Sequence, residues 1–273
     1  MKVQIVEFDA KSYWEKRLQN NWGLGGVGHT GYGVYYNRWL YKVRKKVFNQ
    51  HIRSLSLNFE QSKVLDIGSG TGFYLDIWKS LRVKSVTGSD ITKVSVKRLK
   101  KLYPEFSIVR LDIGSSLVGE DFFEDKFDVI TAFDVLFHIV DDEKFRKAVF
   151  NISRLTTSGG YFIFSDNFLH SKTIKNTHQV SRSIEEISNI LEDAGFRIVK
   201  RVPMFVLMNI PVDTRSNWPS LLWRLLMSPV RIFNVLGFLY GVILFPLEIL
   251  LIRVSKESPS TEMMICQKMR QLI

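Results

Sequence analysis

The 273-residue chain has almost no cysteine, and we find no internal repeat and no low-complexity tract in it. Cys266 is the single cysteine, which excludes an internal disulfide and a cysteine-rich zinc cluster and favours a reducing compartment. Residues 1–10 hold no apolar stretch of the kind that a secretory signal needs, so we expect a cytoplasmic protein. Acidic residues are scarce relative to basic ones, which gives a formal net charge of +11. Beyond solubility, this excess favours an anionic partner, either nucleic acid or a membrane surface.

The first 60 residues precede the first expected strand, and we expect them to form a helical cap. Tyr13, Trp14 and Leu18 recur at helical spacing. A loop rich in glycine and tyrosine follows at residues 23–36 and carries His29, and a basic helix comes after it. The sequence therefore divides into a cap at 1–60 and a main domain at 61–273.

From residue 63 onward, short apolar runs alternate with helical patterns, which is typical of a parallel sheet with helices on both faces. The chain is 45% hydrophobic and 24% charged, the balance of a folded protein. Strands are expected at 63–67, 84–90, 106–111, 127–133, 160–165, 196–202 and 262–268. Helices are expected at 73–81, 92–102, 141–155 and 184–194.

The most informative segment is an apolar run that ends at Asp66 and is followed by Gly68, Gly70 and Gly72. Such a pattern indicates a buried strand that enters a tight turn, whose backbone a ligand can approach. A dinucleotide site needs the spacing G-x-G-x-x-G, but Phe73 stands where its third glycine belongs. The acid at the strand end would also repel a diphosphate, whereas it would attract a cationic ligand.

This segment resembles motif I of the class I S-adenosylmethionine-dependent methyltransferases, whose cofactor carries an ammonium and a sulfonium and no phosphate. The resemblance covers residues 60–202 and 260–270. It implies an α/β fold with a doubly wound, seven-stranded, mostly parallel sheet, in which strands six and seven run antiparallel. It also implies S-adenosylmethionine as the cofactor, and there is a partial similarity to O-methyltransferases of quinones, lipids or sugars.

The resemblance further implies which residues hold the cofactor. In the family, the acid at the position of Asp66 takes the ammonium, directly or through water. The acid at Asp90 accepts both ribose hydroxyls, which a carboxylate with two oxygens can do, and Asp112 meets the adenine amine. The implied cofactor residues are Asp66, Gly68, Ser69, Gly70, Gly72, Asp90, Ile91, Asp112, Ile113 and Phe133. The alternative is that these acids only cap loops or helices.

Two histidines are candidate catalytic bases. His138 follows the fourth strand, where many small-molecule methyltransferases carry a histidine, and a neutral imidazole can accept a proton near pH 7. His29 in the cap is the second candidate, and either ring could instead be structural. Asp134, Asp166 and Asn167 are similar to the magnesium site of catechol-type O-methyltransferases. The sequence around them departs from that group, so we expect no metal.

An apolar insertion at about 204–258 separates the sixth and seventh strands. Its segment Ile232–Ile252 has a single charge, Glu248, and is long enough to cross a bilayer. One crossing would put the two strands on opposite sides of the membrane, although they must share a sheet. We therefore expect the insertion to lie in the membrane interface, with its helix interrupted at Pro246.

The residues that border the apolar segment suit an interfacial position. Tryptophan and tyrosine favour the headgroup level, and arginine favours anionic lipid. The residues concerned are Trp218, Trp223, Tyr240, Arg224, Arg231 and Arg253. An apolar dimer interface and a hydrophobic substrate lid are the alternatives.

Taken together, the sequence predicts methylation of a small or membrane-borne acceptor, such as a lipid-linked sugar, a quinone precursor or another lipid. The enzyme would be peripheral, on the inner face of a membrane. An NAD-dependent oxidoreductase is disfavoured by Phe73 and Asp66, and a non-catalytic membrane-bound scaffold with the same fold stays open. RNA would suit the net charge, but we find no RNA-binding module and no Asn-Pro-Pro-Tyr-type motif, so we expect no nucleic-acid partner.

Overall fold

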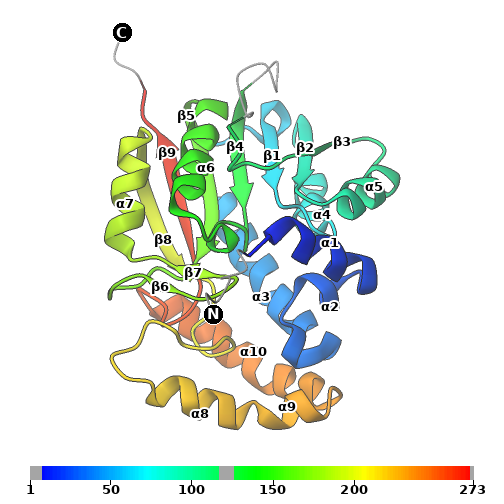
Figure 1. The fold of residues 1–273 in the computed structure, drawn as a ribbon, viewed down its shortest axis with the longest axis vertical. Coiled ribbons are helices and arrows are strands. Elements are labelled where there is room, and N and C mark those ends of the chain that lie inside the picture. Colours follow the sequence, from blue (N-terminus) through cyan, green and yellow to red (C-terminus); the bar gives the residue numbers. More distant parts are fainter. Residues whose placement is uncertain (1–7, 117–125, 271–273) are drawn as a thin grey trace, which may run out of the picture.

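The computed structural model describes residues 8–116 and 126–270. Residues 1–7, on which the expected lack of a secretory signal largely rests, lie outside the described residues. A seven-stranded sheet in the order β3-β2-β1-β4-β5-β9-β8 organises the chain (Figure 1). The strands are β1 (Lys63–Ile67), β2 (Ser85–Asp90), β3 (Ser107–Arg110), β4 (Phe127–Ala132), β5 (Thr156–Asp166), β8 (Phe196–Pro203) and β9 (Glu262–Lys268).

Strands β1 to β5 run parallel to their neighbours, and β9 lies antiparallel to both β5 and β8. The predicted fold class is thus confirmed, including the antiparallel last strand. Strand β5 begins at Thr156 rather than at residue 160, because Thr156 pairs with Phe127 ahead of an irregularity in register. A short hairpin of β6 (Ile174–Lys175) and β7 (Val180–Ser181) was not predicted.

Successive residues of the strands enter two hydrophobic layers. Val64 belongs to a cluster with side chains of α3, α4 and α5, whereas Leu65 belongs to a second cluster with side chains of α6 and α7. A strand that is buried on both faces has a continuous apolar sequence. For this reason the bounds predicted from the sequence lie close to the observed ones. The helices are α3 (Gly33–Ile52), α4 (Phe73–Ser80), α5 (Lys93–Leu102), α6 (Asp142–Leu155) and α7 (Ile184–Asp193).

The cap begins with α1 (Ala10–Asn20) and α2 (Leu24–Val27), followed by a 3-10 turn at Thr30–Tyr32 and the start of α3. The expectation of a plain loop at 23–36 was therefore wrong. Asn37 orders this segment, since its Oδ1 accepts from the backbone N–H of His29 at 2.8 Å and its Nδ2 donates to the His29 carbonyl at 2.9 Å. Those bonds supply local partners that glycine-rich composition does not reveal.

The insertion folds into α8 (Trp218–Leu226), α9 (Ser228–Ile232) and α10 (Leu236–Val254). Pro246 lies inside α10 and does not interrupt it, contrary to the expectation. The proline removes one backbone hydrogen bond, but packing of α10 along α3 supports the helix. The interfacial role expected of Trp223 is also wrong. Its side chain is 8% exposed and its Nε1 donates to the Leu207 carbonyl at 2.9 Å, so it anchors the insertion internally.

Helix α10 packs against α3 through its small residues. A Cβ at Gly241 would lie 1.8 Å from Cδ1 of Trp39, and one at Gly237 would lie 2.8 Å from the backbone nitrogen of Tyr36. Within the described ranges, α10 is also the helix that is long and apolar enough to cross a bilayer, with a mean hydropathy of 1.9. The close contact with α3 nevertheless ties one side of it to the folded domain.

The buried charge in α10 serves the fold. The carboxylate of Glu248 accepts hydrogen bonds from the backbone N–H groups of Val206 and Leu207 at 2.7 Å and of Met208 at 2.9 Å. These donors belong to the segment that leaves β8. The single charge in the apolar run therefore fixes the start of the insertion to its last helix.

We predict that Gly241→Leu separates α10 from α3, because no space exists for the added side chain. Overpacking of this kind lowers the free energy of unfolding by about 1–3 kcal/mol, which denaturant unfolding measures. Val242→Leu on the exposed side of the same helix is the control, and it should change stability by no more than about 0.5 kcal/mol. Equal effects of the two substitutions would contradict the packing described here.

Candidate functional site

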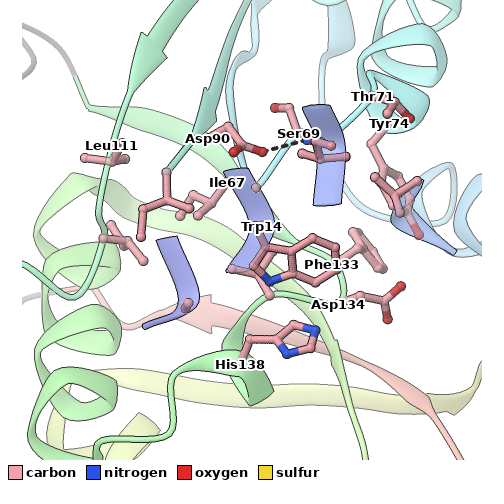
Figure 2. A pocket seen from close by; sticks show the side chains of 18 of the residues that line it. Trp14, Ile67, Ser69, Thr71, Tyr74, Asp90, Leu111, Phe133, Asp134 and His138 are labelled. Atoms are coloured by element: carbon pink, nitrogen blue, oxygen red, sulfur yellow. Dashed lines mark hydrogen bonds between the residues drawn. The ribbon is translucent and has the colours of Figure 1, made fainter. Parts of the chain in front are cut away.

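The turn between β1 and α4 forms one wall of a cavity at the carboxyl edge of the sheet (Figure 2). Gly68 adopts φ 70°, in the left-handed region that favours glycine, and a Cβ there would lie 2.3 Å from Cγ2 of Val135. The backbone N–H of Gly70 donates to Oδ2 of Asp90 at 2.9 Å. The glycines thus let the turn close tightly against the end of β2.

Most of the predicted cofactor residues line this first cavity. They are Gly68, Ser69, Gly70, Asp90, Ile91, Asp112, Ile113 and Phe133. Trp14 of the cap also lines it, and Figure 2 shows this ring between Asp90 and His138, beside Phe133. The sequence did not single out Trp14 for this position, since its helical spacing indicated only a buried face.

The lining of the first cavity is acidic. Asp90, Asp112 and Asp134 contribute to it, and its described lining residues include neither lysine nor arginine. A diphosphate would meet the carboxylates of Asp90 and Asp112 there without a lining cation, whereas a ligand with an ammonium and a sulfonium would be attracted. The charge of the cavity thus opposes an NAD site and fits S-adenosylmethionine.

Neighbouring residues hold the Asp90 carboxylate in place by hydrogen bonds, and the carboxylate can still accept a further hydrogen bond. Its Oδ1 accepts from the backbone N–H and the hydroxyl of Thr92 at 2.9 and 2.7 Å, and its Oδ2 accepts from Gly70. Burial raises the pKa of this carboxyl. Because each carboxylate oxygen can accept two hydrogen bonds, Oδ2 retains room for a ribose hydroxyl.

Two predicted cofactor residues do not line the cavity. Asp66 is 1% exposed, and its Oδ1 accepts from the Thr131 hydroxyl at 2.7 Å. Burial raises its pKa to about 6, and its buried Oδ2 has no partner in the described part of the chain. Gly72 instead faces Tyr103, whose hydroxyl donates to the Gly72 carbonyl at 3.1 Å. The structure therefore places Asp66 beneath the turn and Gly72 against Tyr103, the residue directly after α5.

A second cavity of about 330 Å³ adjoins the first. Five residues line both cavities, namely Trp14, Val27, Tyr41, Asp134 and His138. The second cavity is more polar, and its wall includes Phe205, Asn209, Ile210 and Val212 from the start of the insertion. The insertion thus contributes directly to the space next to the cofactor cavity.

His138 lies where the two cavities meet. Its Nδ1 is 2.9 Å from the carbonyl oxygen of His178, so Nδ1 carries the hydrogen and Nε2 is the free base. Burial lowers its pKa to about 4, which keeps the ring neutral at pH 7 and makes it a weaker base than an exposed imidazole. The ring also packs edge-on against Trp14, with centroids 5.1 Å apart.

His29 lines the second cavity alone. The backbone N–H of Gly31 donates to its Nδ1 at 3.3 Å. Burial lowers the pKa of His29 to about 4, and the nearby charges of Arg17 and Arg231 add to this effect. The two candidate bases are therefore not equivalent, since only His138 borders both cavities.

Sequence reasoning missed Arg44, which it counted only as part of a basic helix. In the structure its Nη1 lies 2.7 Å from Oδ2 of Asp134, in a partly buried ion pair where the two cavities meet. Asp134 has φ 58°, an unusual value for a residue other than glycine. No local signal pairs these residues, because they come from the cap and the end of β4.

The ion pair with Arg44 involves Asp134, one of the three residues that are similar to a magnesium site. Asp134 already has a cationic partner, and Asp166 accepts from the backbone N–H of Asn167 at 2.7 Å. Burial raises the pKa of Asp166 to about 7. Among residues 8–116 and 126–270, no group of three or more His, Cys, Asp or Glu side chains could hold a metal ion.

The comparisons with known proteins agree with this geometry. Residues 65–164 match the family model for a methyltransferase domain. No curated protein matches the chain in sequence.

Three solved structures illustrate the similarity of fold. A candidate sarcosine dimethylglycine methyltransferase from Galdieria sulphuraria is 14% identical, with 95% of this chain and 100% of that chain covered and a TM-score of 0.61. Magnesium protoporphyrin IX methyltransferase from Synechocystis PCC 6803, solved with bound SAH, is 14% identical, with 94% and 97% covered and a TM-score of 0.56. The [4+2]-cyclase SpnF is 15% identical, with 83% and 81% covered and a TM-score of 0.54. Since one of the three is named as a cyclase, the fold alone does not dictate methyl transfer.

We predict that Asp90→Ala weakens S-adenosylmethionine binding by about 1.5–3 kcal/mol, the range for hydrogen bonds to a charged group. Titration calorimetry measures this, and NAD should give no binding to the unmodified chain. Thr92→Val is the control, because it removes one donor to Asp90 and keeps the carboxylate. Unchanged affinity in a folded Asp90→Ala protein would place the cofactor elsewhere.

Proposed function

We propose that this chain, whose residues 65–164 match the model for a methyltransferase domain, is a class I S-adenosylmethionine-dependent methyltransferase. We further propose that it methylates a hydroxyl group of an acceptor that comes from a membrane surface. The observation that carries this proposal is the junction of the two cavities. The acidic first cavity meets the polar second cavity at Asp134 and His138, and the segment after β8 lines the second one. That segment is fixed to α10, whose other side is exposed and apolar.

When bound, S-adenosylmethionine supplies a methyl group on a sulfonium. The glycine turn, Asp90 and Asp112 would hold this cofactor, in keeping with a wall that bears negative charge. The buried, unpartnered Oδ2 of Asp66 lies beneath the same turn and would add to the attraction for a cation.

The proposed base is His138. A neutral ring with a free Nε2 can accept the proton of an acceptor hydroxyl, and the carbonyl of His178 fixes the tautomer that this requires. Trp14 and Phe137 pack against the imidazole and orient it, with ring centroids 5.1 and 4.5 Å away. Holding the two reactants in adjoining cavities supplies the proximity on which methyl transfer depends.

The insertion presents a broad apolar surface, which we name the apolar face. Its helices lie together at the lower end of the molecule in Figure 1. Fifteen large apolar side chains there are 45–72% exposed, and soluble monomers rarely gather so many exposed apolar side chains on neighbouring helices. The residues of the apolar face are Trp218, Leu221, Leu222, Leu225, Leu226, Ile232, Phe233, Val235, Phe238, Leu239, Val242, Ile243, Leu247, Leu250 and Val254.

Cations border the apolar face, which supports a membrane more than a second copy of the chain. Lys42 on α3 lies 3.8 Å from the ring centroid of Trp39, and that ring packs against Phe245 of α10. Arg224, Arg231 and Arg253 lie on or beside the same helices. We therefore propose a peripheral protein on the cytoplasmic side of an anionic membrane.

We expect His138→Ala to leave cofactor affinity nearly intact and to lower turnover by about 10²–10⁴-fold, the usual contribution of a general base. Since the pKa of His138 is lowered to about 4, the rate of the unmodified enzyme should be lost only as the pH falls toward about 4, where the ring becomes protonated. The pH–rate profile of methyl transfer to a membrane extract measures both effects.

His29→Ala provides the comparison for this base, because His29 borders the second cavity only. It should reduce turnover much less than His138→Ala. An unchanged rate in His138→Ala together with a large loss in His29→Ala would reverse the two assignments.

We predict that the chain floats with anionic liposomes and that part of this binding weakens as salt rises. Each arginine near a negative surface adds about 1 kcal/mol, while apolar burial supplies the rest. A variant with a Gly-Ser link in place of residues 212–257 should stay in solution. The deletion exposes parts of α3, so a second variant, Leu225→Glu with Leu250→Glu, keeps the helices and should also lose binding. Failure of the full chain to float would refute the membrane proposal and favour a dimer interface.

A further inference from the structure

Three arginines gather where the second cavity meets the insertion. Arg17 lies on α1 and lines the second cavity, Arg224 lies on α8, and Arg231 lies on α9. Arg17 is more than 200 positions away from the other two arginines, which lie on consecutive helices of the insertion. Their common location raises the question of which anion they face.

Arg17 is built into the wall of the second cavity. Its Nη2 donates to the Gly28 carbonyl at 2.6 Å, its Nη1 donates to the Tyr13 hydroxyl at 3.1 Å, and its guanidinium lies 4.6 Å from the ring centroid of Trp14. These neutral partners fix the position of the guanidinium and leave its charge uncompensated. Its buried Nε has no hydrogen-bond partner within the described residues.

Arg231 stands beside the same part of the cavity wall. A Cβ at Gly31 would lie 3.7 Å from Nε of Arg231 and 3.6 Å from Nδ1 of His29. His29 and Thr30 both line the second cavity, so Arg231 lies at its rim.

The electrostatic effects of the three arginines overlap at this rim. Burial lowers the pKa of His29, and the charges of Arg17 and Arg231 lower it further. Burial raises the pKa of Tyr32, whereas Arg231 and Arg224 act in the opposite direction. The rings of His29 and Tyr32 are in contact, with centroids 4.3 Å apart. The arginine charges that act on these two side chains are therefore concentrated in one region.

Within residues 8–116 and 126–270, none of the three arginines has a carboxylate within ion-pair distance. Asp134 is the acid in the described lining of the second cavity, and it is paired with Arg44. The rim therefore keeps a net positive charge that a ligand can neutralise.

We propose that Arg17, Arg224 and Arg231 bind the phosphate or diphosphate of a lipid-linked acceptor. The apolar chain of this acceptor then lies along the apolar face, and its head extends into the second cavity toward His138. This inference rests on the proposed function, and it adds the chemical class of the acceptor. General anionic lipid is a poorer match, because a bilayer surface does not reach Arg17 inside the cavity wall.

The head of the acceptor is expected to be uncharged and rich in hydroxyls, as in a sugar. Amide side chains offer both donors and acceptors to such a group, and aromatic rings beside them can cover its apolar faces. The amides in the second cavity, apart from Asn37, which holds the cap together, are Asn167, Asn176, Gln179 and Asn209. A planar quinone ring has few hydroxyl groups for these amides to bind, so the second cavity favours a sugar over a quinone.

The test compares two kinds of phosphatidylcholine vesicle with equal negative charge. One kind contains a polyprenyl diphosphate and the other contains phosphatidylglycerol. The full chain should bind the diphosphate vesicles about tenfold or more tightly, the scale of charge-assisted hydrogen bonds. Arg231→Gln should lose this preference, because it removes a charge at the rim without touching the cofactor cavity.

Arg253→Gln is the matched control. Arg253 is also exposed on the insertion, but it lies at the far end of α10, about 26 Å from the start of that helix. This variant should bind both kinds of vesicle slightly less tightly and keep the preference for diphosphate. All three proteins should bind S-adenosylmethionine equally in calorimetry, which shows that they are folded.

Four results have distinct meanings. No preference in the full chain, or an equal loss in both variants, would overturn the inference and leave membrane attachment in place. Displacement of the full chain by inorganic pyrophosphate as effectively as by the lipid would assign the site to free phosphate and overturn it too. Failure to bind either vesicle would refute the membrane route of the proposed function together with this inference.

Discussion

The position of β9 between β5 and β8 is the constraint on which the rest of the structure depends. Because β9 is antiparallel to both neighbours, β8 runs in the same direction as β5 and ends at the same edge of the sheet. Glu262 at the start of β9 pairs with Asp166 on one side and with Pro203 on the other. The insertion must therefore leave and return at the carboxyl edge, which is also where a doubly wound sheet binds its ligands.

This constraint brings the apolar insertion and the chemistry together, and Glu248 makes the connection rigid. Its carboxylate binds three successive backbone N–H groups, at Val206, Leu207 and Met208. Tyr36 of the cap donates to the carbonyl of Met208 at 2.7 Å, and Trp223 of α8 donates to that of Leu207. The cap, α8 and α10 thus all hold one short segment, whose neighbours Phe205 and Asn209 line the second cavity. If α10 moved in a membrane, the backbone N–H groups bound to Glu248 would have to move with it, because buried N–H groups need an acceptor. Such a movement would change the adjoining wall of the second cavity.

Features that depend on neighbouring residues could be predicted from the sequence, and features that depend on tertiary contacts could not. The strands and the turn at Gly68 follow from apolar runs and glycine spacing, and Asp90 and Asp112 were found because they stand directly after strands. The pairing of Arg44 with Asp134 joins residues that are 90 positions apart in sequence, so no local pattern contains it. Glu248 was recognised as the single charge in an apolar run, but its partners lie about forty residues earlier in the chain.

The same distinction explains the errors in the cap and the insertion. Composition predicted a loop at residues 23–36, whereas Asn37 supplies the hydrogen bonds that let the segment fold into short helices. Pro246 is a helix breaker in isolation, yet α10 continues through it because α3 supports the helix from one side. In both cases a contact with another element outweighed the local propensity.

The two cavities differ in charge, and this difference gives the proposed reaction a direction. The first has three aspartates and no cation among its described lining residues, while the rim of the second carries arginines without acidic partners. Under the proposed function, a cationic donor would therefore be drawn to the first cavity and an anionic acceptor to the second. Asp134 and Arg44 neutralise each other near the boundary, so neither ligand is pulled across it. Since both cavities are partly shielded from water, these preferences are stronger than they would be on an open surface. In the proposed reaction, the reacting groups would meet at His138, which lines both cavities.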